Sequence, residues 1–172
     1  MIKKSFITIL LCLIMAAQSG VAAYANSDGI SVIVDDKPLQ MDALPKIING
    51  RVMVPLKSVM DAIPTRLGGT VGDSLVWDEA EGRVGFTVLD MPVSYEYSMI
   101  IGDPVITIIF RSSAGPVTSL ETLDYPPVID EGGVLVSLEF LAETTYSDVG
   151  WDPENRTITI YSVEYLYHAY EP

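Results

Sequence analysis

The sequence predicts an α+β fold, mainly antiparallel sheet, built from two related β-β-α-β-β halves that each contain one short helix. One observation is an internal repeat: DALPKIINGRVMVPLKSVMDAI starts at Asp42, and DYPPVIDEGGVLVSLEFLAETT starts at Asp124. A second is the Trp-Asp pair that follows each copy, at residues 77–78 and 151–152. A third is the alternation of apolar and polar residues over most of the remaining chain, which is typical of half-buried strands.

Each copy begins with a predicted hairpin whose turn carries a glycine. Gly50 of the first copy matches Gly132 of the second. Asn49-Gly50 is a strong turn signal because both residue types accept a positive φ. Val52 and Val54 follow in alternation with polar or flexible neighbours, so a strand should leave the turn.

A two-turn helix should follow this strand in each copy. In the first copy the apolar residues recur at i, i+3, i+4 and i+7: Leu56, Val59, Met60 and Ile63. Pro64 should end this helix. In the second copy Ser137 is placed to cap a matching helix that begins at residue 138.

The remaining elements are predicted to be strands. After each Trp-Asp pair, a polar loop leads into an alternating strand, and Asp78 and Asp152 are placed to accept hydrogen bonds from the loop backbone. Further strands are expected at residues 31–34, 37–41, 93–97 and 105–110. The two halves should pack on one another or share strands.

These elements divide the chain into four segments, of which the first is an export signal. Lys3 and Lys4 precede the apolar run FITILLCLIM, and Ala23-Tyr24-Ala25 fits a signal peptidase site. We expect cleavage after Ala25 and a secreted or envelope-associated product; an uncleaved N-terminal anchor is the alternative. The other three segments are a first repeat at 26–90, a second at 91–162, and a tyrosine-rich tail at 163–172.

Composition excludes several partners of the mature chain. Residues 1–25 hold two of the ten basic residues and no acidic one, so 8 basic and 23 acidic residues remain, a net charge of −15. Nucleic acid and anionic membranes both require a basic face, so neither is an expected partner. No second apolar stretch has the length of a membrane span. The single cysteine, Cys12, is lost with the signal.

Acidic side chains in turns raise the possibility of calcium binding. Asp78, Glu79 and Glu81 crowd one hairpin loop, although their spacing is not that of an EF-hand. A second acidic group surrounds the turn of the second repeat: Asp124, Asp130 and Glu131. The favoured interpretation of both groups is that they are structural turn residues, with no bound metal.

Aromatic side chains are the other candidate binding residues. The equivalent positions of Trp77 and Trp151 in the repeat favour a role as core anchors, and a pair of sugar-stacking platforms is the alternative. Tyr165, Tyr167 and Tyr170 lie in the tail, where the alternation predicts an edge strand. That strand would either pack on the domain or pair with a partner by strand addition.

The order of these motifs resembles a known family. NGRVMVPLKSVMDAI with a Trp-Asp hairpin, repeated as GGVLVSLEFLAE with GWDPENRTITI, is similar to the copper amine oxidase N-terminal-like (stalk) domain of exported bacterial proteins, over about residues 30–162. The chain departs from the family pattern at Lys57, where arginine is usual, and at residues 137–139, which replace a second Val-Pro-Leu-Arg. The resemblance implies an antiparallel sheet with a helix that serves as a non-catalytic appendage and does not itself bind copper.

These observations predict a non-catalytic module, without cofactor, that binds a protein or a cell-wall polymer outside the cytoplasm. His168 is the only histidine and no cysteine remains after cleavage, which does not suit a copper site or a nucleophilic enzyme. One alternative is a carbohydrate-binding or hydrolytic domain that uses Trp77, Trp151 and nearby acids. Another is a calcium-dependent or self-assembling structural protein.

Overall fold

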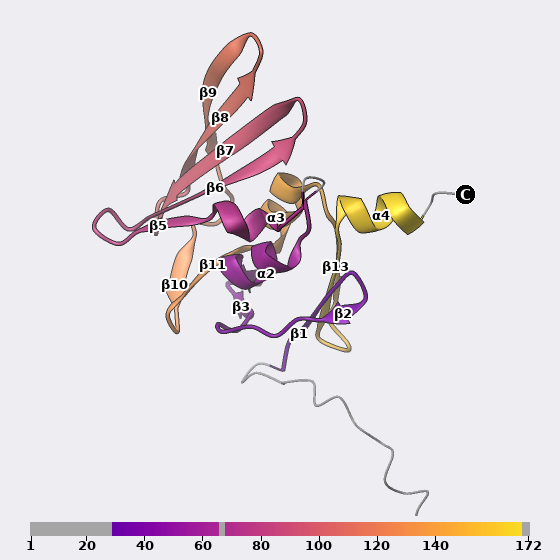
Figure 1. Cartoon of the computed structure of the whole chain (residues 1–172). Coiled ribbons are helices and arrows are strands. Elements are labelled where there is room, and N and C mark those ends of the chain that lie inside the picture. Colours follow the sequence, from indigo (N-terminus) through magenta and orange to yellow (C-terminus); the bar gives the residue numbers. More distant parts are fainter. Residues whose placement is uncertain (1–28, 66–67, 170–172) are drawn as a thin grey trace, which may run out of the picture.

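The computed structural model describes residues 29–65 and 68–169, which form three β-sheets, three short α-helices and one 3₁₀ turn (Figure 1). Most strand pairs are antiparallel, so the predicted α+β class is confirmed. The predicted signal (residues 1–25), with Cys12, and Tyr170 lie outside the described residues. Within the described ranges, no helix combines the length and apolar character needed to cross a membrane.

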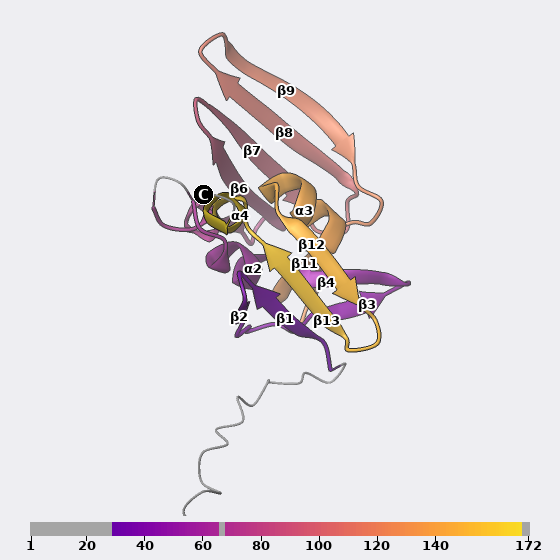
Figure 2. The ribbon, with the colours of Figure 1, turned by 90° about the vertical axis from the view of Figure 1, so that its right-hand side faces the viewer.

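The first sheet joins the two ends of the described chain (Figure 2). Its strands are, in spatial order, β12 (Asp148–Asp152), β13 (Thr157–Tyr161), β1 (Ser31–Val34) and β2 (Lys37–Pro38). β1 runs parallel to β13, and the other two pairs are antiparallel. The strand predicted at 37–41 is limited to two residues, after which one further backbone hydrogen bond joins the Leu39 N–H to the Val32 carbonyl at 2.8 Å.

The second sheet is made of the two glycine-turn hairpins. Its strands are, in spatial order, β10 (Val128–Asp130), β11 (Gly133–Ser137), β4 (Arg51–Pro55) and β3 (Lys46–Ile48). Gly50 and Gly132 have φ of +80° and +84°, and the residue before each is also left-handed, as two-residue primed turns require. β4 pairs with β11, so strands from both predicted halves share this sheet.

A short helix follows each central strand of this sheet directly: α2 (Leu56–Ala62) after β4 and α3 (Leu138–Thr145) after β11. The Ser137 hydroxyl accepts a hydrogen bond from the Phe140 N–H at 3.1 Å and so caps α3. α2 begins after Pro55 without a side-chain cap and buries Leu56, Val59 and Met60. Its stability therefore comes from the buried apolar face.

The third sheet extends away from the rest of the molecule as long hairpins (Figures 1 and 2). The 3₁₀ turn η1 (Val71–Ser74) leads into it, and its strands are β5 (Val76–Asp78), β6 (Arg83–Asp90), β7 (Val93–Ile100), β8 (Val105–Ser112) and β9 (Gly115–Thr122). β9 was not predicted. Its sequence GPVTSLET has little apolar alternation, and nearly all of it is exposed at the sheet edge, so pairing with β8 holds it in place.

One apolar core joins the three sheets. Phe86 of β6 stacks on Tyr97 of β7 with ring centroids 5.0 Å apart, and Phe140 of α3 meets both rings edge-on at 6.3 Å. These contacts fix α3 against the inner face of the third sheet. The core continues through buried side chains of the other sheets, among them Val32, Val54, Val136 and Ile158.

The tail is a helix, and the prediction of an edge strand there was wrong. α4 (Val163–Ala169) begins after Ser162, whose hydroxyl accepts a hydrogen bond from the Tyr165 N–H at 3.1 Å. Glu164 and His168, four residues apart, are joined at 3.1 Å. Local contacts three and four residues apart outweigh the alternation of tyrosines, which had suggested a strand.

The β1–β2 turn anchors α4, and Asp35→Ala is expected to release it. The Asp35 carboxylate accepts hydrogen bonds from the Ser162 N–H at 2.8 Å and the Ser162 hydroxyl at 2.7 Å. Amide hydrogen exchange should show faster exchange in α4 for Asp35→Ala. Asp152→Ala, which removes a loop carboxylate at the other end of β13, is the control and should leave α4 protected. Equal protection of α4 in Asp35→Ala and in the wild-type chain would contradict the anchor.

Candidate functional site

Trp77 is on the surface, and the prediction that it anchors the core was wrong. It is in the edge strand β5, opposite Val84 of β6, and 40% of its surface is exposed. Trp151, its equivalent in the repeat, is half-buried in β12 and packs against the core. Both strands are sheet edges, but they differ in what they pack on: every residue of β5 is exposed, whereas Val149 and Trp151 of β12 pack against the core.

Trp77 lines a surface groove of about 510 Å³, referred to below as the Trp77 groove. It lies between the β5–β6 hairpin, the start of α2 and the β10–β11 hairpin. Its lining is mainly apolar, with two charged side chains: Leu56, Lys57, Leu75, Trp77, Glu79, Gly82, Val84, Ile129, Gly132, Gly133 and Val134. An apolar groove of this volume with a few polar groups is the usual form of a ligand site.

Glycines shape the wall opposite Trp77. Gly132 needs its left-handed φ for the β10–β11 turn. A Cβ on Gly133 would collide with the Cβ of Ala43, so only glycine allows this hairpin to pack so closely. Ile129 is 52% exposed beside them. This wall therefore combines accessible backbone with one exposed apolar side chain.

The lining of the groove contains one basic and one acidic side chain, Lys57 and Glu79. Lys57 donates to Asp61 at 2.5 Å, one helical turn away, and this hydrogen bond raises the pKa of Lys57. Glu79 contributes one negative charge to the lining. A smaller pocket of about 160 Å³ shares Lys57 and the 132–134 wall with the groove and is also lined by Asp42 and Glu131. The two depressions therefore adjoin.

The calcium candidates are engaged in local contacts. The Asp78 carboxylate accepts hydrogen bonds from the N–H groups of Ala80 and Glu81, at 3.0 and 3.3 Å. The Glu81 side chain accepts two hydrogen bonds from Arg83, at 3.0 and 2.9 Å. Across the described ranges, no three histidine, cysteine or acidic side chains converge as a metal site would need.

The other acidic group and the second Trp-Asp pair are also held by protein partners. Asp124 pairs with Arg51 at 2.8 Å, and Lys46 pairs with both Asp130 and Glu131. The Asp152 carboxylate accepts three hydrogen bonds, from the N–H groups of residues 154 and 155 and from the Asn155 side-chain amide. The Asn155 amide is the largest cause of the lowered pKa of Asp152.

The tail tyrosines do not form one binding surface. Tyr165 stacks on Tyr161 at 5.4 Å, and its hydroxyl donates to Asp36. Tyr167 is exposed and lies edge-on to His168. The Tyr165 side chain therefore fastens α4, and of these two only Tyr167 faces solvent.

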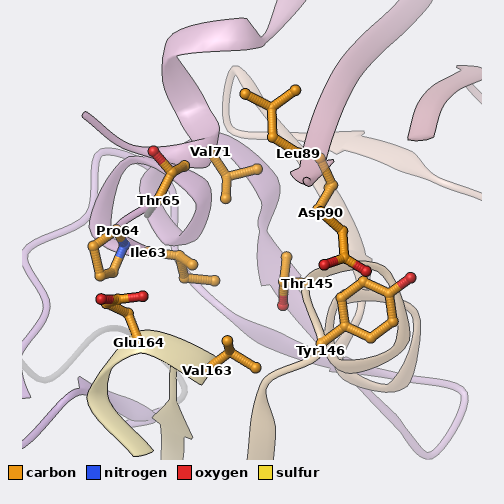
Figure 3. Close-up of a pocket in the computed structure, with 11 residues that line it drawn as sticks. Ile63, Pro64, Thr65, Val71, Leu89, Asp90, Thr145, Tyr146, Val163 and Glu164 are labelled. Atoms are coloured by element: carbon orange, nitrogen blue, oxygen red, sulfur yellow. The ribbon is translucent and has the colours of Figure 1, made fainter. Parts of the chain in front are cut away.

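A third depression, a pocket of about 290 Å³, lies between α4, the end of β6 and the C-terminal ends of α2 and α3 (Figure 3). Tyr146 and Asp90 stand side by side on one flank, and Val163 and Glu164 of α4 close it from below. Burial raises the pKa of Tyr146 from 10.0 to about 12 and that of Tyr97, in the core, further still. Sequence reasoning found none of the three depressions, because each forms between segments distant in the chain.

These tyrosines predict a loss of stability in alkali. A phenol with a raised pKa in the folded state favours folding below its unfolded pKa near 10, and this stabilisation is lost as pH rises toward 12. Urea midpoints should therefore fall between pH 10 and 12. Tyr97→Phe has no phenol to ionise and should show a smaller fall than the wild-type chain. An equal fall in both proteins would show that Tyr97 is not responsible.

Comparison with known proteins identifies the family. The family model described as copper amine oxidase N-terminal domain matches residues 33–160, which include the second and third sheets, part of the first sheet and both Trp-Asp pairs. Searches of curated proteins and of solved structures give no match. The resemblance inferred from the motifs is confirmed. The chain belongs to the copper amine oxidase N-terminal domain family, whose members are non-catalytic domains.

Proposed function

We propose that this chain is an exported, non-catalytic module of the cell envelope that binds an extracellular polymer or protein through the Trp77 groove. Membership of a non-catalytic domain family supports the non-catalytic role. The signal-like sequence of residues 1–25 supports export. The observation that carries the binding role is the groove itself, about 510 Å³ of mainly apolar surface beside an exposed tryptophan.

We further infer that residues 26–90 and 91–162 are two copies of one unit. Val54 and Val136 match in the repeat and lie opposite one another in the β4–β11 ladder. On either side, Met53 pairs with Ser137 and Pro55 with Leu135, as a twofold relation between the copies would give. The Trp77 groove uses the first copy's Trp-Asp hairpin and the second copy's glycine turn, which supports binding by the pair together.

Co-sedimentation with purified cell-wall sacculi tests this proposal. The secreted form, residues 26–172, should pellet saturably with sacculi of the producing organism, and an unrelated acidic protein should not. Co-sedimentation is measured with and without calcium. The calcium-dependent alternative predicts that the protein pellets only when calcium is present. Mass spectrometry of the protein recovered from the culture medium and envelope should find Asn26 at the N-terminus. A chain that stays in the supernatant in both buffers would overturn binding to the wall polymer.

A further inference from the structure

We propose that the Trp77 groove binds a neutral, N-acetylated glycan chain, an inference that rests on the proposed envelope function. Trp77 supplies a stacking surface for a sugar ring. Its indole stands at the open edge of the third sheet with 40% of its surface exposed, and its neighbour Val84 is buried beneath the same face. The C–H groups on one face of a pyranose ring pack well on such a flat aromatic surface, which is large and polarisable.

The rest of the lining suits the remaining groups of an N-acetylated sugar. Leu75 and Ile129 provide apolar surface for the methyl group of an acetamide. Lys57 and Glu79, a donor and an acceptor, stand at the same groove and can bond ring hydroxyls. Gly132 and Gly133 leave backbone accessible between them. A ligand that is apolar on one face and hydroxylated at its edge matches this combination.

Charge selects a neutral polymer over the anionic ones. The secreted chain carries 8 basic and 23 acidic residues, a net charge of −15, which repels polyanions at long range. At the groove the only described cation, Lys57, is already paired with Asp61. A ligand phosphate or carboxylate would therefore meet no unpaired positive charge there, whereas an uncharged sugar needs none.

The presence of a second depression beside the groove favours a chain over a single small molecule. The groove and the smaller pocket share Lys57, Gly132, Gly133 and Val134 in their linings, so the two depressions lie next to one another. The groove is also open along the surface between two hairpins. A linear glycan can lie along this path with one ring on Trp77 and the next toward Asp42 and Ser58 of the smaller pocket.

The binding test uses the full secreted chain carrying Trp151→Phe. The chain has two tryptophans, so Trp77 becomes the only one and its fluorescence reports on the groove. The probe is a β-1,4-linked tetramer of N-acetylglucosamine. We expect a saturable change in fluorescence and weaker binding of cellotetraose, which lacks the acetamido groups. Equal binding of the two tetramers would overturn the acetamide contact.

Matched variants of the otherwise wild-type chain locate the site, with calorimetric titration as the readout. Trp77→Ala should weaken binding of the N-acetylglucosamine tetramer by at least about tenfold, as is common for a central aromatic contact. Val76→Ala, next to it on the opposite face of β5 and also exposed, should bind as the wild type does. Trp77→Phe should retain part of the affinity. Thermal unfolding of each variant shows whether it is folded.

The outcomes separate this inference from the proposed function. If the tetramer does not bind, or binds folded Trp77→Ala as tightly as the wild type, the glycan site is refuted. If Trp77→Ala then still pellets with sacculi, the envelope function stands and uses another surface. If a peptide fraction of the wall competes for the groove and the tetramer does not, the occupant is a peptide and the inference is wrong. If the tetramer binds but the wild-type protein does not pellet with sacculi, the glycan site stands and the envelope function is refuted.

Discussion

Leu141→Ala should lower the free energy of unfolding by about 2–5 kcal/mol, the range typical of leucine truncation in a close-packed core. Leu141 lies on the buried face of α3 with no exposed surface, inside the cluster that joins the three sheets. The substitution leaves a cavity where the second sheet and its helix meet. Because α3 also holds Phe140 against Phe86 and Tyr97, the substitution should weaken the packing of the third sheet as well as that of the second.

The chain offers a matched control for this substitution. Leu120→Ala removes the same atoms from β9, where 69% of the leucine is exposed, and should change stability by no more than about 0.5 kcal/mol. Urea denaturation followed by circular dichroism gives both values. Similar losses in the two variants would mean that α3 is not part of the shared core.

Local patterns were sufficient for the parts of the fold that local chemistry determines. The glycine turns at 50 and 132 form because few other residues adopt their φ, and α2 follows the apolar spacing that begins at Leu56. The family, too, was recognisable from motif order alone. The turns and the helix each depend on a few consecutive residues, and the family depends on the order in which such local motifs follow one another.

The failures concern residues whose structure depends on distant partners. β9 is a strand because β8 lies beside it, and its own sequence has no strand signal. α4 is fastened to the molecule by Asp35, 127 residues before the Ser162 that caps it. Trp77 is exposed because no other part of the fold covers β5, whereas the core covers Trp151, and the repeat could not indicate this difference. The groove was not predicted for the same reason, since its two walls are hairpins about 50 residues apart in the chain.

Gly72→Ala should destabilise the protein by about 1–3 kcal/mol, the usual cost of overpacking a tight contact. Gly72 is a buried residue of η1, packed on the last turn of α2. An added Cβ would lie 2.7 Å from the backbone nitrogen of Asp61 and 2.9 Å from its Cα, as well as against its carboxylate. Because backbone atoms cannot rotate away as a side chain can, α2 and η1 would have to separate.

The same substitution at Gly150 should have the opposite sign. A Cβ there meets no atom within 4 Å, and the residue lies in strand β12 without a left-handed φ. Alanine then restricts the unfolded chain at no cost to the native structure, which stabilises by about 0.4–1 kcal/mol. Urea unfolding of both variants measures the difference. If Gly72→Ala were as stable as Gly150→Ala, then α2 and η1 would not pack as closely as the contact between Gly72 and Asp61 implies.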